Sequence, residues 1–160
     1  MKKLFLFILV GAIMFVCGNA FAQTATQTVT FQVTAIDEIS VSGDPGALIV
    51  SSATAGSQPT AATDATTTYS ITTNGSSKKI TGDVDSAMPA NTILAVTLTA
   101  PSIGSSAGSV TLTATAADLV TGIATVAEGS LSISYNFSAT VTAGILTSDT
   151  RTVTLTLTDV

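Results

Sequence analysis

Few residues of this 160-residue chain could carry out chemistry. The chain contains no His, and its only cysteine, Cys17, precedes residue 23. From residue 23 onward it therefore lacks the usual general base at neutral pH, a thiol nucleophile and the ligand sets of zinc and copper. We predict that the protein is not an enzyme and that it needs no cofactor.

Two weaker constellations remain. Residues 76–79 place two serines beside two lysines, but lysines in an exposed turn keep their protons at neutral pH and make poor general bases. Asp83 and Asp85 lie two residues apart on one face of an expected strand end. This spacing is too short to place two carboxyl groups on opposite sides of a sugar. Neither set changes the prediction.

Calcium is the one metal that the residue types allow, because it takes carboxylate and carbonyl oxygens from loops. The candidate ligands are Asp37 with Glu38, and Asp83 with Asp85. No Asp-x-Asp-x-Asp-Gly loop accompanies them, so we predict no metal site and interpret these acids as solvated side chains at strand ends. A calcium-stabilised adhesin domain remains an alternative.

The first 22 residues have the pattern of an export signal. Lys2 and Lys3 precede an apolar run over 4–16, and Ala20-Phe21-Ala22 is the small-x-small sequence after which signal peptidase cuts. We predict a cleaved secretion signal over 1–22 and a protein of the periplasm, the cell surface or the extracellular space. No later apolar stretch is long enough for a membrane helix.

The remaining 138 residues (160 minus 22) are predicted to form one domain, 23–160. Its three cations, Lys78, Lys79 and Arg151, stand against ten acidic residues, which gives a net charge of 3 minus 10, or −7. Binding to nucleic acid needs clustered cations that neutralise phosphates. The sequence therefore predicts no nucleic-acid partner.

Alternation of apolar and polar residues with period two dominates the domain and predicts short strands. A helical turn is expected only at 116–120, a long surface loop over 52–65, and a hairpin turn at Asn74-Gly75. The expected strands are 28–33, 39–41, 47–51, 69–71, 80–84, 92–99, 110–114, 131–138, taken as a central core strand, and 152–158. About eight or nine strands with no long helix predict an all-β fold, an antiparallel two-sheet immunoglobulin-like β-sandwich.

The export signal, the alternating segment Thr28–Val33 and the closing strand Arg151–Leu157 together resemble small secreted bacterial β-sandwich proteins of the fimbrial-subunit and spore-coat-U type. The resemblance implies assembly by strand donation, in which an N-terminal segment of one subunit completes a sheet of its neighbour. Val29, Phe31 and Val33 would be the side chains of this assembly strand that fill pockets. The alternative is that the segment is the domain's own first strand.

We therefore expect a non-enzymatic secreted structural or cell-surface protein, pilin-like or coat-like, whose partners are further copies of itself or other envelope proteins. The alternative function is a monomeric extracellular module that binds glycan or protein through the end loops 52–65 and 101–108. These loops carry no aromatic or Arg residue that could anchor a ligand.

Overall fold

The computed structural model describes residues 22–160 of the chain. The chain divides into a first unit, residues 1–32, and a compact second unit, residues 33–160. The described part of the first unit, residues 22–32, contains no helix and no strand. All the regular structure of the described residues belongs to the second unit.

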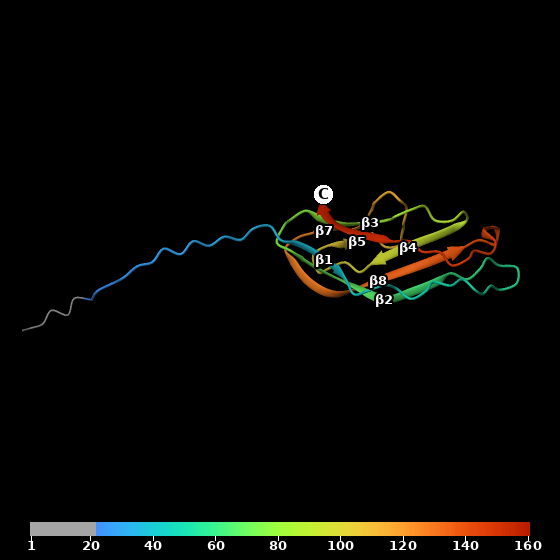
Figure 1. Ribbon diagram of the computed structural model, residues 1–160, viewed down its shortest axis with the longest axis horizontal. Helices are drawn as coiled ribbons and strands as arrows, with labels where there is room; N and C mark the ends of the chain where they lie inside the picture. The colour runs from blue at the N-terminus through green and yellow to red at the C-terminus, as the bar shows by residue number, and fades with distance from the viewer. Residues whose placement is uncertain (1–21) are drawn as a thin grey trace, which may run out of the picture. The chain divides into compact units, whose positions relative to one another are not determined.

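Nine strands and one short 3-10 helix make up this unit (Figure 1). In chain order they are β1 (Asp37–Val41), β2 (Ala62–Thr73), β3 (Lys78–Val84), β4 (Thr92–Leu98), β5 (Ser105–Ser106), β6 (Val110–Thr111), β7 (Ala117–Ile123), β8 (Val126–Ala139), the helix η1 (Val141–Ala143) and β9 (Val153–Asp159).

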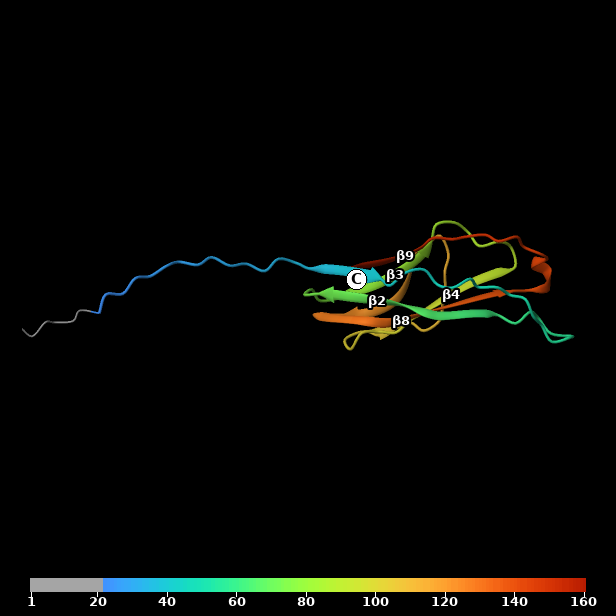
Figure 2. The same ribbon diagram turned by 60° about the horizontal axis from the view of Figure 1, so that its bottom comes forward.

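The strands form two antiparallel sheets that face each other as two layers (Figure 2). One sheet has five strands in the order β1-β2-β8-β4-β6, and the other has four in the order β5-β7-β3-β9. The predicted all-β, two-sheet sandwich is therefore confirmed. Strands β1 and β9 each stand at the end of a strand order and are therefore edge strands.

The prediction of a central strand over 131–138 is also confirmed. This segment lies in β8, which pairs with β2 on one side and β4 on the other. Its alternating residues place Ile133 and Tyr135 in the core, while Leu131 and Phe137 are half-buried. A strand with partners on both edges can satisfy both rows of peptide groups, and β8 has both partners from Ile133 to Phe137.

The core between the sheets consists of aliphatic side chains and two tyrosines. Leu98 on β4 and Ile80 on β3 are fully buried, one from each sheet. Tyr69 on β2 is also buried, and its hydroxyl donates a hydrogen bond to the carbonyl oxygen of Thr99 at 2.5 Å. Burial raises the pKa of Tyr69 to about 12, so this hydroxyl stays protonated and keeps its donor role.

The predicted hairpin at Asn74-Gly75 is wrong. The strands on either side of this turn do not pair with each other: β2 pairs with β1 and β8, while β3 pairs with β7 and β9. Residues 74–77 therefore form an arch that carries the chain from one sheet to the other. Turn residues mark a reversal of the chain, but they do not specify whether the two strands share a sheet.

Two further local predictions are wrong. Residues 117–123 form β7 rather than a helical turn, because pairing with β3 and β5 outweighs a weak helix propensity. Residues 47–51 form no strand. This stretch follows Pro45, which has no N–H to donate, and it runs as irregular backbone.

A core substitution should show how much the sandwich depends on burial between the layers. Leu98 is 0% exposed, so Leu98→Ala should lower the free energy of unfolding by about 2–5 kcal/mol. Leu146 is 45% exposed, and the same substitution there should cost less than about 1 kcal/mol. Urea unfolding of both variants measures the difference, and equal losses would contradict this account of the core.

Candidate functional site

A hollow of the domain lies between the edges of the two sheets. Strand β1 pairs only with β2, and β9 pairs only with β3, so among the described residues each has one edge without a strand partner. The two edge strands approach each other on the same side of the sandwich. Between them runs a groove with a volume of about 820 Å³.

The groove has an apolar floor and walls of mixed polarity. The floor is made by side chains of β4 and β8, namely Leu94, Ile133, Tyr135 and Phe137. The walls carry the apolar residues Ile39 and Val41 on β1 and Val153 and Leu155 on β9, with Ser40, Thr152 and Thr154 between or beside them. The residues of β9 that face inward are only half-buried, so the closing strand predicted from alternation presents part of its apolar face to the groove.

Ion pairs join β1 and β9 at one end of the groove, which we call the base. Lys78 Nζ lies 2.8 Å from Asp37 Oδ2 at the start of β1 and 2.6 Å from Asp159 Oδ1 at the end of β9. The hydrogen bond from Lys78, with a second from Thr73, holds the pKa of Asp37 below its ordinary value of 3.8. The bond to Asp159, then that to Asp37, raises the pKa of Lys78.

Gly75 in the arch leaves space for the Lys78 side chain. A Cβ atom at this position would lie 2.7 Å from Cε of Lys78, so the lysine side chain would have to shift. The absence of a side chain lets the Lys78 stem cross the arch and reach both carboxylates. The Asn74-Gly75 sequence, which predicts a hairpin, instead forms part of the arch at the base of the groove.

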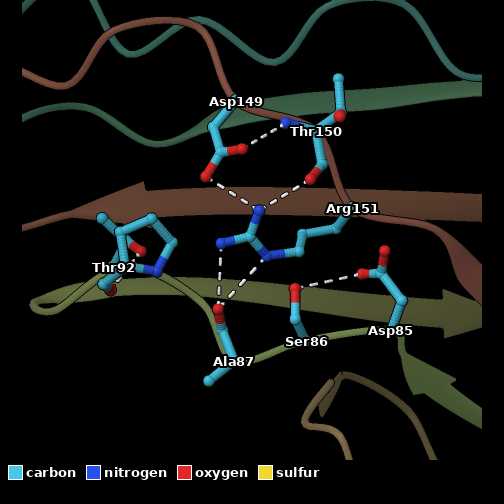
Figure 3. Close-up of polar contacts among 8 residues, drawn as sticks. Asp85, Ser86, Ala87, Thr92, Asp149, Thr150 and Arg151 are labelled. Carbon is cyan, nitrogen blue, oxygen red and sulfur yellow. Dashed lines mark hydrogen bonds and ion pairs between the residues drawn. The ribbon is translucent and has the colours of Figure 1, made fainter.

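The opposite end of the groove, which we call the mouth, is held by Arg151 (Figure 3). Its guanidinium donates to the carbonyl oxygen of Ala87 through Nε at 3.2 Å and Nη2 at 3.0 Å. Nη1 donates to Asp149 Oδ2 at 2.8 Å and to the carbonyl oxygen of Thr150 at 2.7 Å. These contacts fasten the start of β9 to the loop that places Met88 in the groove lining.

Asp149 is fixed in its ionised form by the same cluster. The backbone N–H of Thr150 first, and then Arg151, hold the pKa of Asp149 below 3.8. Because the Arg151 guanidinium already donates hydrogen bonds to oxygens of three residues, we interpret its role as structural rather than as ligand binding.

The predicted assembly residues are exposed. Val29, Phe31 and Val33 are 73%, 88% and 79% exposed, and residues 22–36 form no strand. The strand expected over 28–33 is therefore absent from the described residues. Three large apolar side chains are thus exposed at alternate positions of one segment.

The calcium candidates do not come together. Asp37 is engaged by Lys78, and Glu38 follows it on the opposite face of β1. Asp83 lies in β3, whereas Asp85 lies beyond the end of that strand and accepts a hydrogen bond from the Ser86 hydroxyl at 3.4 Å. Over residues 22–160, no group of three or more His, Cys, Asp or Glu side chains is placed to hold an ion.

The two end loops of the alternative function lie at opposite ends of the sandwich. The prediction of a loop over 52–65 is wrong for its last four residues, because β2 begins at Ala62, which pairs with Phe137 near the mouth. The loop 101–108 lies near the other end, where Ser102 N donates to Glu128 at 3.0 Å. Neither loop lines the groove, so they do not form a common site.

Sequence reasoning missed the groove itself. Its lining comes from residues 39–48, from β4 and β8, and from 149–155, which are distant in the chain. The sequence shows the alternation of β9. Alternation alone predicts a buried face, but it does not predict an edge strand with a groove beside it.

The fold and the groove define a β-sandwich with an open apolar edge. Searches of protein-family models, curated proteins and solved structures each gave no match to this chain. Among residues 22–160, no helix has the length and apolar character needed to cross a membrane. The function must therefore be inferred from the chain's own residues.

The ion pairs at the base should make stability depend on acid. Because the pKa of Asp37 is lowered on folding, its carboxylate stabilises the fold above its unfolded pKa and loses this contribution as the pH falls through the lowered value. Lys78→Met should therefore reduce the loss of unfolding free energy between about pH 5 and pH 2. Urea titrations across this range measure the slope.

Lys79→Met is the matched control for this measurement. It removes the same charge from the adjacent residue, whose Nζ lies 3.0 Å from Asp118, and it leaves Asp37 untouched. The control should keep more of the acid slope than Lys78→Met. Identical slopes in the two variants would refute the role given to the Lys78–Asp37 pair.

Proposed function

We propose that this protein is an exported, non-enzymatic structural subunit that assembles by strand donation. Residues 23–33 of one copy would occupy the groove between β1 and β9 of another. The observation that carries the proposal is that one chain contains both an exposed alternating apolar segment and an apolar groove between two unpartnered sheet edges. The segment has apolar side chains exposed to water, and the groove has apolar space and unpaired backbone that such a segment could fill.

Strand addition suits this groove because it would pair the free sheet edge and fill the apolar space. A donated strand supplies peptide groups to the free edge of β9, and its alternate side chains enter the apolar space. Strand β9 is the better hydrogen-bonding edge, because β1 has five residues and continues into irregular backbone that includes Pro45. Val29, Phe31 and Val33 would face the floor made by β4 and β8.

Charge also favours this occupant. Residues 23–36 contain no charged side chain, whereas all ten acidic residues lie between Asp37 and Asp159. Two acidic domains repel each other, and the repulsion is screened by salt. An uncharged connecting segment adds nothing to this repulsion and carries no charge into the apolar groove.

The position of the donor's exit predicts its direction. Residue 33 leads into β1 at the base, where Asp37 pairs with Thr73, while the mouth lies at the other end of β2, where Ala62 pairs with Phe137. Copies joined base to mouth would insert the donor with residue 23 nearest the base of the acceptor. The donor would then run antiparallel to β9 and parallel to β1.

Under this proposal the protein acts outside the inner compartment of a bacterial cell, in the periplasm, on the cell surface or beyond it. Its partners would be further copies of itself or other envelope proteins with a similar donor segment. The absence of His and Cys after residue 22 agrees with a structural role, because it removes the commonest catalytic groups.

The first test uses matched substitutions in the donor segment. Phe31→Ser should abolish large oligomers and leave monomers, because it removes the largest side chain that would enter the groove. Thr30→Ser, on the opposite face of the strand, should assemble as the parent does. Light-scattering mass after size exclusion measures both, and a peptide of residues 23–34 should bind the Phe31→Ser monomer.

A parent that stays monomeric at all concentrations, with no binding of this peptide, would exclude strand donation. The groove would then be reconsidered as a ligand site, since about 820 Å³ lies within the range of roughly 300–1,000 Å³ typical of small-molecule pockets.

Disulfide trapping tests the direction of the donor. In a Cys17→Ser background there is no other cysteine, so every disulfide reports a designed pair. Antiparallel insertion predicts intermolecular bonds for Val33→Cys with Val153→Cys and for Val29→Cys with Leu157→Cys. Parallel insertion would instead join position 33 to 157 and position 29 to 153, which would contradict the base-to-mouth arrangement.

A further inference from the structure

The three residues between the donor segment and β1 are held by one side chain. Asn74, in the arch at the base, accepts a hydrogen bond from Ile36 N through Oδ1 at 2.9 Å. Its Nδ2 donates to the carbonyl oxygen of Thr34 at 2.8 Å, and its backbone N donates to the carbonyl oxygen of Ile36 at 3.2 Å. Residues 34–36 are therefore fixed to the base before the chain enters β1.

The sequence offers no alternative place to turn. Residues 23–36 contain no Gly, Pro, Asn, Asp or Ser, the residue types that tight turns prefer. None of residues 34–36 has a positive φ. We therefore expect the backbone to leave the base through this segment without reversing its direction.

Two modes of exchange between copies make different demands on this segment. In an open chain, the base of each copy faces the mouth of the next, and the donor continues without reversal. In a closed reciprocal pair, the two domains lie side by side in opposite orientations, and each chain must reverse its direction between residue 33 and β1. The reversal requires residues 34–36 to leave their contacts with Asn74.

We infer that Asn74 is a positioning residue that selects open association over closed exchange. This inference rests on the proposed strand donation. The carboxamide of Asn74 has no place in the groove itself, since the groove lining begins at Ile39. Asn74 acts through residues 34–36. It sets the direction in which the donor segment leaves the domain and does not change how tightly that segment binds a groove.

The test compares full-length chains, expressed for export, that differ at position 74. Asn74→Ala should shift the mass distribution from long oligomers to monomers and dimers by at least threefold in mass fraction. Asn74→Asp keeps the acceptor for Ile36 N and loses the donor to Thr34, so it should give an intermediate distribution. Gln58→Ala is the control, because it removes an exposed amide whose Oε1 accepts from Val141 N at 2.9 Å in a loop near the mouth.

A second measurement separates the effect of Asn74 on residues 34–36 from any effect on the groove. An acceptor chain with Val29→Ser, Phe31→Ser and Val33→Ser cannot donate, and it should bind the labelled 23–34 peptide equally well with or without the further change Asn74→Ala. Equal peptide binding with a changed mass distribution supports the role of Asn74. Equal binding with an unchanged distribution in Asn74→Ala overturns it and leaves strand donation standing.

Two other outcomes are also decisive. If the peptide does not bind the acceptor chain that retains Asn74, strand donation fails and the role of Asn74 fails with it. If Asn74→Ala alone loses peptide binding, the substitution has disturbed the fold, and Asn74→Asp decides: an intermediate distribution with normal binding supports the inference, and a distribution like that of the parent overturns it.

Discussion

Unpaired backbone at the edges of the two sheets is the constraint on which the rest of this structure depends. Strands β1 and β9 each leave one row of peptide groups without a strand partner among the described residues, and both edges border the same apolar groove. Such edges invite pairing with another chain. At the opposite side of the sandwich, β5 and β6 are only two residues long, so little edge is offered there.

The base of the groove shows how a few residues serve several purposes at once. The arch transfers the chain between sheets, Gly75 makes room for Lys78, and Lys78 joins β1 to β9 across the layers. Asn74 fixes the segment that precedes β1. Polar contacts thus join the two sheets at the end of the domain where β1 begins.

Much of the fold could be predicted from alternation, because a period of two is a direct consequence of strand geometry. The strands around residues 71, 82, 95, 134 and 155 are all present. The errors concern pairing and context. Asn74-Gly75 predicts a hairpin, but local turn chemistry contains no information about the partner of each strand. Residues 116–120 favour a helical turn, but helix propensity takes no account of the neighbouring strand β3.

The sequence by itself determined the all-β class and the apolar faces of the strands, because residue type and period act locally. It also identified Val29, Phe31 and Val33 as an alternating apolar set. Only the tertiary structure decided that this set is exposed and that β1 and β9 are edges flanking a groove. The reason is that an edge and a vacancy are defined by the absence of a neighbour, and neighbours in a sandwich come from residues distant in the chain.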